Sequence, residues 1–462
     1  VFYCADCGKP VCTDETIEAV SALFAEKGSN AWFEMDAADI LPKGFACPHC
    51  GKSAGFTKEE DTLDGWFDSG STHFAAMKKD QGFWPATMYL EGLDQYRGWF
   101  QSSLLTAVGA FGEGARFKEC VTHGWTVDGE GRAMHKSLGN GVDPADIFNE
   151  NGADILRLWA ASADYHADVR CSKAIFQQLS QNYLKFRNTC KFMLDNLVDF
   201  DPAHLTKAED MPVLDRWLIT KLNELIEKVE QSYNDYEFHI ITHAVNDFCV
   251  TTLSSFYLDI VKDRLYCEAA DSAERRSAQT ALYLTLSTLA KLFAPILAFT
   301  CDEIWLAMPH TAEDDARNVV LNDMNKPFTA YALDAETMAR WEHIIEVRTA
   351  VNGALEEARA AKVIGKSLEA DVHLTVPEGD VFLADENPAA LADLFIVSKV
   401  ELTVGGELAV KVENAAGTKC PRCWKHSLTP NAEGLCPRCA EVVRHLPDLL
   451  SAKYCVIRRR SA

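Results

Sequence analysis

The residues with the clearest chemical capacity lie in a polar loop at 131–140, which reads Gly-Arg-Ala-Met-His-Lys-Ser-Leu-Gly-Asn. We expect a strand at 120–127 before it and a helix that opens at Asp143-Pro144, because aspartate caps helices and proline suits their first turn. Glycines give the loop hinge freedom, and Lys136 adds a mobile positive charge. Such a charge suits the stabilisation of phosphate oxygens. The alternative is a solvated connector with a chance lysine.

The 16 cysteines include four pairs with the two-residue spacing of metal knuckles. The C-terminal set is Cys420, Cys423, Cys436 and Cys439, and the N-terminal set is Cys4, Cys7, Cys47 and Cys50. Four thiolates on two tight knuckles can surround Zn²⁺ as a tetrahedron, and with no open position such sites stabilise folds. Redox dithiols are the alternative. Cys12 and His49 are spare donors, which we interpret as bystanders.

The other cysteines occur singly among apolar residues and predict core thiols. They are Cys120, Cys171, Cys190, Cys249, Cys267, Cys301 and Cys455.

A further motif spans residues 89–100 and reads as the end of a strand, a glycine turn and a helix. Open α/β sheets bind ligands at such places. The alternative interpretation is that Asp94 only caps the helix and Glu91 is exposed.

These motifs resemble signatures of the class I aminoacyl-tRNA synthetases. The loop at 131–140 resembles the second signature of that family, K-M-S-K-S, and the segment 89–100 resembles the adenylate-binding segment of its isoleucine-specific branch. Residues 61–70, 256–264 and 294–305 extend the resemblance over nearly the whole chain. Within the loop only Lys136 and Ser137 match cleanly. Ala133 stands where the family has its first lysine, and His135 where it has its first serine.

The resemblance implies that ATP, with Mg²⁺, activates isoleucine and that the acyl group then passes to isoleucine tRNA. Lys136 would stabilise phosphate charge, with Ser137 and His135 beside it in the catalytic loop. Glu91 would hold the adenylate, while Gly92, Asp94 and Gln95 would line the same crevice. His135 adds positive charge only while protonated, because histidine titrates near pH ~6.5.

The first ATP signature of the family, H-I-G-H, does not occur in this sequence. We therefore expect the chain to be the carboxyl-terminal half of an isoleucine-specific synthetase. By itself it should be nearly inactive, because half of an active site cannot hold the reactants in position. One alternative is a truncated tRNA-binding protein without catalysis. Another is a fragment of a valine-specific relative, although the ribbon containing Cys423-Trp424 resembles the isoleucine branch.

The bulk composition favours a large multidomain protein. At 462 residues the chain exceeds a single core, and it has no apolar run near the ~18 residues of a membrane span. Without a secretory leader we expect a cytoplasmic monomer, and the start at Val1 in an expected strand suggests a fragment. The net charge of −23 argues against a uniformly basic surface. The segment from Lys419 is basic, and its Arg458-Arg459-Arg460 run predicts either RNA contact or a solvated tail.

The expected fold is multidomain, α/β plus all-α. The element pattern predicts five parts: a zinc-knuckle module at 1–60, half of a Rossmann-type nucleotide-binding domain at 61–160, a helical bundle at 161–330, a small α+β unit at 331–415 and a zinc ribbon at 416–462. The resemblance implies that 1–60 is the end of the connective insertion of the family and that the bundle is its anticodon-binding domain. Helices are expected at 14–27 and 335–361, and strands at 370–376, 395–404 and 407–412. Leu282, Leu286, Leu289 and Phe293 form an expected core stripe.

Overall fold

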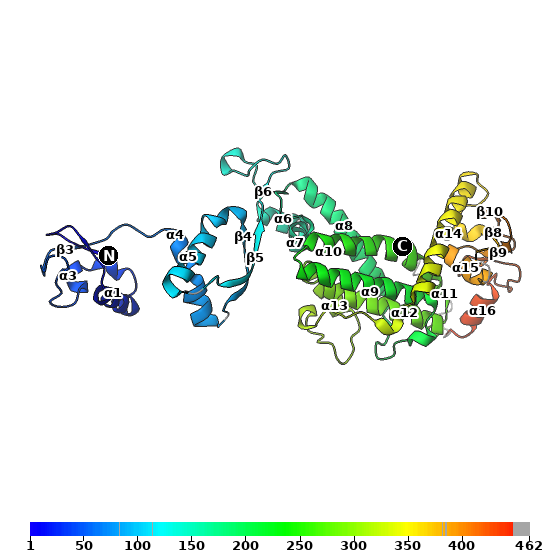
Figure 1. The fold of residues 1–462 in the computed structure, drawn as a ribbon. Helices are drawn as coiled ribbons and strands as arrows, with labels where there is room; N and C mark the ends of the chain where they lie inside the picture. Colours follow the sequence, from blue (N-terminus) through cyan, green and yellow to red (C-terminus); the bar gives the residue numbers. More distant parts are fainter. Residues whose placement is uncertain (83, 113, 381, 384–385, 447–462) are drawn as a thin grey trace. The chain divides into compact units, whose positions relative to one another are not determined.

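The computed structural model describes residues 1–82, 84–112, 114–380, 382–383 and 386–446. The chain forms two compact units, Val1–His123 and Gly124–Ala462, and each is described by itself (Figure 1). The boundary between the units lies inside the part expected at 61–160. The five-part division therefore stays a prediction.

The first unit begins with a small module around a three-stranded antiparallel sheet of order β2-β1-β3. Its elements are β1 (Phe2–Cys4), β2 (Pro10–Val11), α1 (Asp14–Lys27), α2 (Ala31–Glu34), α3 (Ala37–Ile40) and β3 (Phe56–Lys58). The predicted helix at 14–27 is confirmed, and Thr13 caps it by accepting a hydrogen bond from the amide of Thr16. Phe2, Ile40 and Phe45 are buried in the core of the module.

The remainder of the first unit holds the elements around the 89–100 motif. They are α4 (Gly65–Gly70), the π-helix η1 (His73–Gln81), β4 (Ala86–Gly92), the 3₁₀ turn η2 (Leu93–Tyr96), α5 (Trp99–Phe111) and β5 (Phe117–His123). Strands β4 and β5 pair in parallel, as a strand-helix-strand unit requires. Buried Tyr89 fixes α5 on the sheet, since its ring lies 4.5 Å from Trp99 and 4.7 Å from Phe117.

Helix α5 has an unusual distribution of side-chain sizes. Its buried residues are Ser103 and Ala107, whereas Leu104, Leu105 and Val108 are exposed. A helix normally buries its large apolar residues. Cys120, predicted to be a core thiol, is likewise exposed, because β5 has only β4 as a neighbour in the described part of this sheet.

The second unit opens with short parallel strands that carry the 131–140 loop. These are β6 (Thr126–Val127) and β7 (Val169–Arg170), with the 3₁₀ turn η3 (Lys136–Leu138), α6 (Pro144–Asn151) and α7 (Ala153–Ser162) between them. The strand expected at 120–127 is divided into β5 and β6, with Gly124 and Trp125 between them. Asp143 caps α6 at the amide of Ala145, which confirms the predicted helix start.

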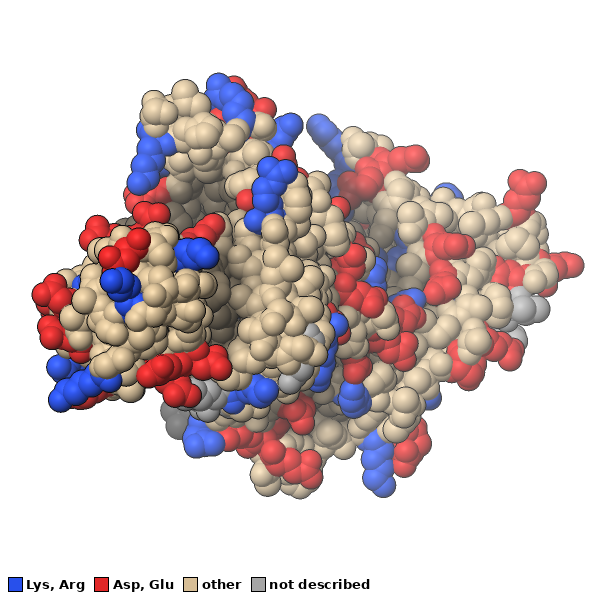
Figure 2. All heavy atoms as spheres, turned by 60° about the vertical axis from the view of Figure 1, so that its left-hand side comes forward, with Lys and Arg blue, Asp and Glu red and all other residues tan. Residues whose placement is uncertain are grey.

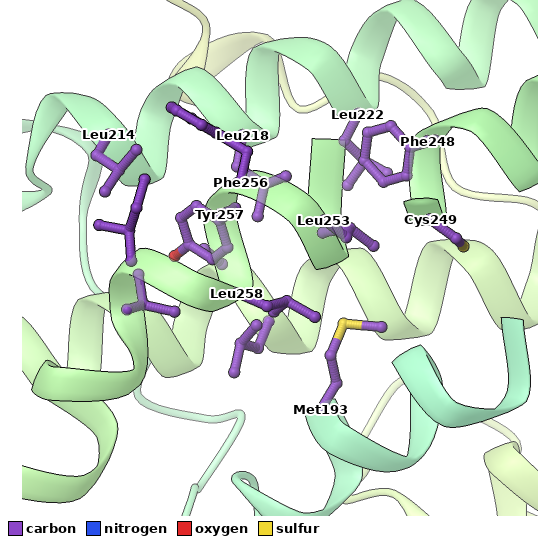
Figure 3. Close-up of a cluster of buried hydrophobic side chains, with 14 of the residues drawn as sticks. Met193, Leu214, Leu218, Leu222, Phe248, Cys249, Leu253, Phe256, Tyr257 and Leu258 are labelled. Carbon is purple, nitrogen blue, oxygen red and sulfur yellow. The ribbon is translucent and has the colours of Figure 1, made fainter. Parts of the chain in front are cut away.

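A helical bundle follows. It comprises α8 (Lys173–Asp195), α9 (Val213–Asn234), α10 (Phe238–Asp247), the π-helix η5 (Phe248–Tyr257), α11 (Leu258–Cys267), α12 (Ala273–Phe293) and α13 (Ala298–Ala307), with short 3₁₀ turns η4 (Ala208–Asp210), η6 (Val319–Leu321) and η7 (Thr329–Tyr331). Figure 3 shows Met193, Leu218 and Leu253 from α8, α9 and η5 in one apolar interior. The predicted stripe of α12, from Leu282 to Phe293, is buried there.

A carboxylate of α9 lies in the interior of this bundle. Asp215 is fully buried and accepts hydrogen bonds from Tyr257 Oη (2.8 Å), Ser277 Oγ (2.5 Å) and Arg264 Nη1 (3.2 Å). Because every buried charge needs partners, these contacts fix α9, α11 and α12 in one register.

The last part combines a helix, a sheet and the ribbon. Its elements are α14 (Ala335–Ala360), η8 (Ser367–Glu369), β8 (Ala370–Val376), α15 (Pro388–Phe395), β9 (Lys399–Val404), β10 (Ala409–Asn414), β11 (Thr418–Lys419), β12 (His426–Ser427) and α16 (Pro437–Arg444). The sheet order is β10-β8-β9, with β9 parallel and β10 antiparallel to β8. The strand expected at 395–404 begins only at Lys399, because 388–395 is a helix that ends at Ile396 with a φ of 58°.

No helix among the described residues is long and apolar enough to cross a membrane. Acidic and basic side chains are interspersed over the face drawn in Figure 2. The negative net charge is therefore not gathered into one field on that face.

Candidate functional site

The 131–140 loop is built on a hairpin-like turn whose base is Asp128. Only 6% of Asp128 is exposed, and its carboxylate accepts hydrogen bonds from the amides of Glu130 (3.0 Å) and Arg132 (2.9 Å). It also accepts from Arg132 Nε and Asn140 Nδ2, both at 2.9 Å. These donors, led by Asn140, hold the pKa of Asp128 well below its ordinary value. The carboxylate is therefore a permanent anion at the base of the loop.

The central residues of the loop are presented to solvent. His135, Lys136 and Ser137 are exposed. Met134, which precedes them, packs against the buried cluster that contains Ile147 and Phe176. Within the described chain, the side chains of Lys136 and Ser137 make no hydrogen bond or ion pair. The lysine charge is thus accessible from solvent, and its role towards a phosphate stays a prediction.

The 89–100 segment places its polar residues at the end of β4. Half-buried Glu91 accepts a hydrogen bond from the amide of Gly92 at 2.9 Å. A Cβ at Gly92 would lie 2.7 Å from Asp94 Oδ1, so a side chain there would require Asp94 to move. The Asp94 carboxylate accepts from Gln95 Nε2, and Gln95 Oε1 accepts from the amide of Trp99.

The alternative prediction, that Asp94 only caps the helix, is wrong. Its side chain caps neither η2 nor α5, and Gln95 satisfies the first turn of α5 instead. Glu91 is also half-buried rather than simply exposed. The structure brings Glu91, Gly92, Asp94 and Gln95 together at one strand end of the first unit. His135, Lys136 and Ser137 lie together in the second unit, and the catalytic roles of both groups stay predictions.

The C-terminal cysteines converge as the spacing predicts. The thiols of Cys420, Cys423, Cys436 and Cys439 lie within 4.8 Å of one another, and Cys423 Sγ is 3.8 Å from Cys436 Sγ. Zinc-sulfur bonds of about 2.3 Å give a tetrahedron whose edges are about 3.8 Å. This set can therefore hold a zinc ion.

The N-terminal cysteines form a second set of the same kind. The thiols of Cys4, Cys7, Cys47 and Cys50 lie within 4.8 Å of one another, with sulfur-sulfur distances of 3.7 Å (Cys4 to Cys50) and 3.8 Å (Cys7 to Cys47). Burial opposes the thiolate of Cys47, but the amides of His49 and Cys50 outweigh it and lower its pKa to about 7. Neither Cys12 nor His49 belongs to this set.

The C-terminal ribbon is anchored to the end of α11. Arg438 forms a fork on Asp263, with Nη1–Oδ2 and Nη2–Oδ1 distances of 2.5 and 2.8 Å, and its Nη1 also reaches Glu268 at 2.9 Å. Arg422 donates to the carbonyl of Cys267. These contacts could not be identified from the sequence, because no local pattern links residues so far apart.

The sequence analysis also missed the roles of Asp128 and Asn140. A signal was present, since Asp followed closely by glycines, here Asp128-Gly129-Glu130-Gly131, is typical of a tight turn with a side-chain acceptor. The terminal arginines 458–460 lie outside the described residues.

Two protein families match the chain. Residues 1–172 match the family of class I tRNA synthetases (I, L, M and V), and residues 215–374 match the anticodon-binding domain of tRNA ligase. Curated isoleucine-tRNA ligases are similar along almost the entire chain. Those of Moorella thermoacetica and Desulforamulus reducens are 47% and 48% identical over 96% of this chain, and that of Carboxydothermus hydrogenoformans is 48% identical over 97%. In each case the match covers 50% of the relative, so the chain spans about half the length of these curated relatives.

A solved structure supports the fold. The chain is similar to LeuRS of Agrobacterium radiobacter K84, whose structure is a ternary complex with tRNA and LeuAMS. The TM-score is 0.52 at 16% identity, and the similarity covers 90% of this chain and 44% of that one.

Proposed function

We propose that this chain is the carboxyl-terminal half of an isoleucine-tRNA ligase of the class I tRNA synthetase family, whose family model matches residues 1–172. The observation that carries this proposal is the similarity to isoleucine-tRNA ligases along nearly all of its length. The complete enzyme would join isoleucine to ATP and pass the acyl group to isoleucine tRNA.

The chemistry assigned to this half is charge stabilisation. Lys136, exposed and without a partner in the described chain, would meet the phosphates of ATP, which carries Mg²⁺ as a polyphosphate usually does. As pyrophosphate departs, this cation would offset the charge that develops on its oxygens. Ser137 would donate a hydrogen bond to the same group, and His135 would add charge only while protonated.

The end of β4 would hold the adenylate. Glu91 and Gln95 offer carboxylate and amide groups there, and Gly92 keeps the strand end open to close approach. Ligands of open α/β sheets bind at such carboxyl ends.

Several features of the first unit indicate that another polypeptide segment completes it. Parallel sheets are covered on both faces and seldom have two strands alone, yet β4 pairs only with β5 in the described chain. Leu105 is 59% exposed on α5, beside exposed Leu104 and Val108. The segment that the relatives carry outside the matched half would cover these residues and add strands. Alone, the chain would have little activity.

The second unit would bind isoleucine tRNA through its bundle and ribbon, as a monomeric enzyme of the cytoplasm. Each cysteine set would hold one structural Zn²⁺. Local contacts would overcome the negative net charge.

ATP-pyrophosphate exchange tests the proposal. We expect no isoleucine-dependent exchange by the chain alone, and exchange after co-expression with the amino-terminal half of the Moorella thermoacetica relative. Lys136→Ala should then lower kcat by about 10² to 10³, the usual loss of one charge-stabilising group. Lys173→Ala is the matched control, because Lys173 is exposed and paired only with Glu150.

The same pair of halves separates the alternatives. Binding of isoleucine tRNA without any exchange would favour a non-catalytic tRNA-binding protein. Activation and charging of valine instead of isoleucine would show a valine-specific enzyme and overturn the isoleucine assignment.

A further inference from the structure

Two polar side chains outside the exposed centre of the 131–140 loop tie its ends together. Asp128 comes directly after β6, and Asn140 follows η3 at the far end of the loop. Their side chains meet through Asn140 Nδ2 and Asp128 Oδ2 at 2.9 Å. The loop is thus closed at its base by a side-chain contact as well as by backbone pairing between Val127 and Ala133.

Asn140 uses both ends of its amide for this closure. Its Nδ2 also donates to the carbonyl of Ala133 at 3.1 Å, and its Oδ1 accepts from the amide of His135 at 2.9 Å. The residues on both sides of Met134 are therefore fixed by one side chain. Only asparagine or glutamine carries a donor and an acceptor in this arrangement, and glutamine would be one methylene longer.

Asp128 fixes the other flank. Its carboxylate accepts four hydrogen bonds: two from backbone amides, one from Arg132 Nε and one from Asn140 Nδ2. Hydrogen bonds to a carboxylate are stronger than neutral ones. The base of the loop is consequently rigid, while Lys136 to Leu138 form a single exposed 3₁₀ turn that ends at Gly139 with a φ of 62°.

We propose that Asp128 and Asn140 form a latch that holds this loop ready for a polyphosphate, so that Lys136 needs little reorganisation when ATP binds. The proposal rests on the function proposed above and makes both residues positioning residues. The physical reason is that a flexible cation loses binding free energy to ordering, whereas a preorganised one does not. Neither residue is needed to touch the nucleotide.

The first test uses the chain alone and asks whether the latch exists in solution. Hydrogen exchange of the Arg132 and His135 amides is measured for the parent, for Asn140→Ala and for Asn151→Ala. Asn151 is the matched control, since its amide makes one long hydrogen bond of 3.4 Å to Ser180. We expect these two amides to exchange about tenfold faster or more in Asn140→Ala, the effect of losing hydrogen bonds to a charged network, and at the parent rate in Asn151→Ala. Unchanged exchange in Asn140→Ala would overturn the latch.

The second test separates positioning from mere folding. In the two-part enzyme, Asn140→Asp places a second carboxylate against Asp128 and removes the donor. The KM for ATP should rise about tenfold or more, with the KM for isoleucine unchanged. Combining Asp128→Asn with Asn140→Asp restores a donor and an acceptor between the two side chains but loses the contacts with Arg132 Nε and the Ala133 carbonyl, so it should recover only part of the lost ATP affinity.

The outcomes distinguish the proposal from its premise. Faster amide exchange with both KM values unchanged, or no recovery in the double variant, would mean that the two residues only stabilise the turn, which overturns positioning. A parent two-part enzyme without any exchange would overturn the proposed function and the positioning role with it. Faster exchange together with a rise in the KM for ATP alone supports both.

Discussion

Replacing Arg438 by methionine should detach the zinc ribbon from the helical bundle. The guanidinium of Arg438 makes three hydrogen bonds to Asp263 and Glu268 at the end of α11. It also holds the pKa of the Asp263 carboxyl below its ordinary value, although burial alone would raise it. Methionine keeps the length and apolar character of the side chain but leaves two carboxylates without their cation.

The size of the effect follows from burial. Removing one partner of a buried ion pair costs about 3–5 kcal/mol. The side chains of Arg438 and Asp263 are 34% and 24% exposed, so water recovers part of this, and we expect about 2–3 kcal/mol. Since 1.4 kcal/mol is a factor of ten, the opening equilibrium of the ribbon should rise about 30- to 150-fold.

Hydrogen exchange of the α16 amides measures that opening directly. Protection should fall by the same factor in Arg438→Met. Arg444→Met is the control, because the pair of Arg444 and Glu441 lies on the same helix with side chains 68% and 55% exposed. It should change protection by less than about threefold.

A double-mutant cycle checks the cause. Adding Asp263→Asn to Arg438→Met should lower protection less than the sum of the single changes, because the lone carboxylate is then gone. Equal effects of Arg438→Met and Arg444→Met, or strict additivity in the cycle, would refute the reasoning.

Four further results are expected. Chelation should release about two zinc ions per chain, and Cys436→Ser should reduce the content to one, as measured by atomic absorption; a parent value of one would eliminate the N-terminal site. Burial opposes the charge of Asp199, but its hydrogen bonds with Arg275 and Gln279 lower its pKa to about 2, so its stabilisation is present above pH ~4 and lost as the pH falls towards 2. Asp199→Asn should therefore lower Tm at pH 7 and leave it unchanged near pH 2, and equal losses at both pH values would contradict the ion-pair explanation. Leu105→Glu should not destabilise the chain in urea but should block co-purification with the other half, whereas Leu306→Glu, at an exposed position of α13, should leave co-purification unchanged. Replacing Arg458, Arg459 and Arg460 should weaken tRNA binding and flatten its salt dependence, and an unchanged slope would exclude these arginines from the interface.

Local signals in the sequence were sufficient for several elements. Helix α1 was predictable from the Thr13 cap and the glycine after Lys27, and β8 from the strict alternation of apolar and polar residues over 370–376. Helix α15 was missed because apolar residues continue from Leu394 through Val397, and only the left-handed conformation of Ile396 separates helix from strand. A β-branched residue seldom adopts that conformation, so no sequence rule anticipates it.

For the candidate site, residue types were predictable but partners were not. The spacing of the cysteines sufficed for both zinc sets, because each knuckle is local. The exposure of Cys120 was not predictable, because it depends on which strands pair with β5. The contact between Asp128 and Asn140 also depends on the path of the whole loop, which local patterns do not encode.

If the C-terminal cysteines hold a zinc ion, the attachment of the ribbon to α11 would couple that ion to any ligand of the bundle, and such coupling is reciprocal. If zinc raises the affinity of the docked protein for RNA by some factor, bound RNA must raise the affinity for zinc by that same factor. Arg422 and Arg438 would transmit this coupling, since they join the knuckles to the last turn of one bundle helix. In a cell short of zinc, molecules bound to RNA would then lose their metal last, and molecules without RNA would lose it first.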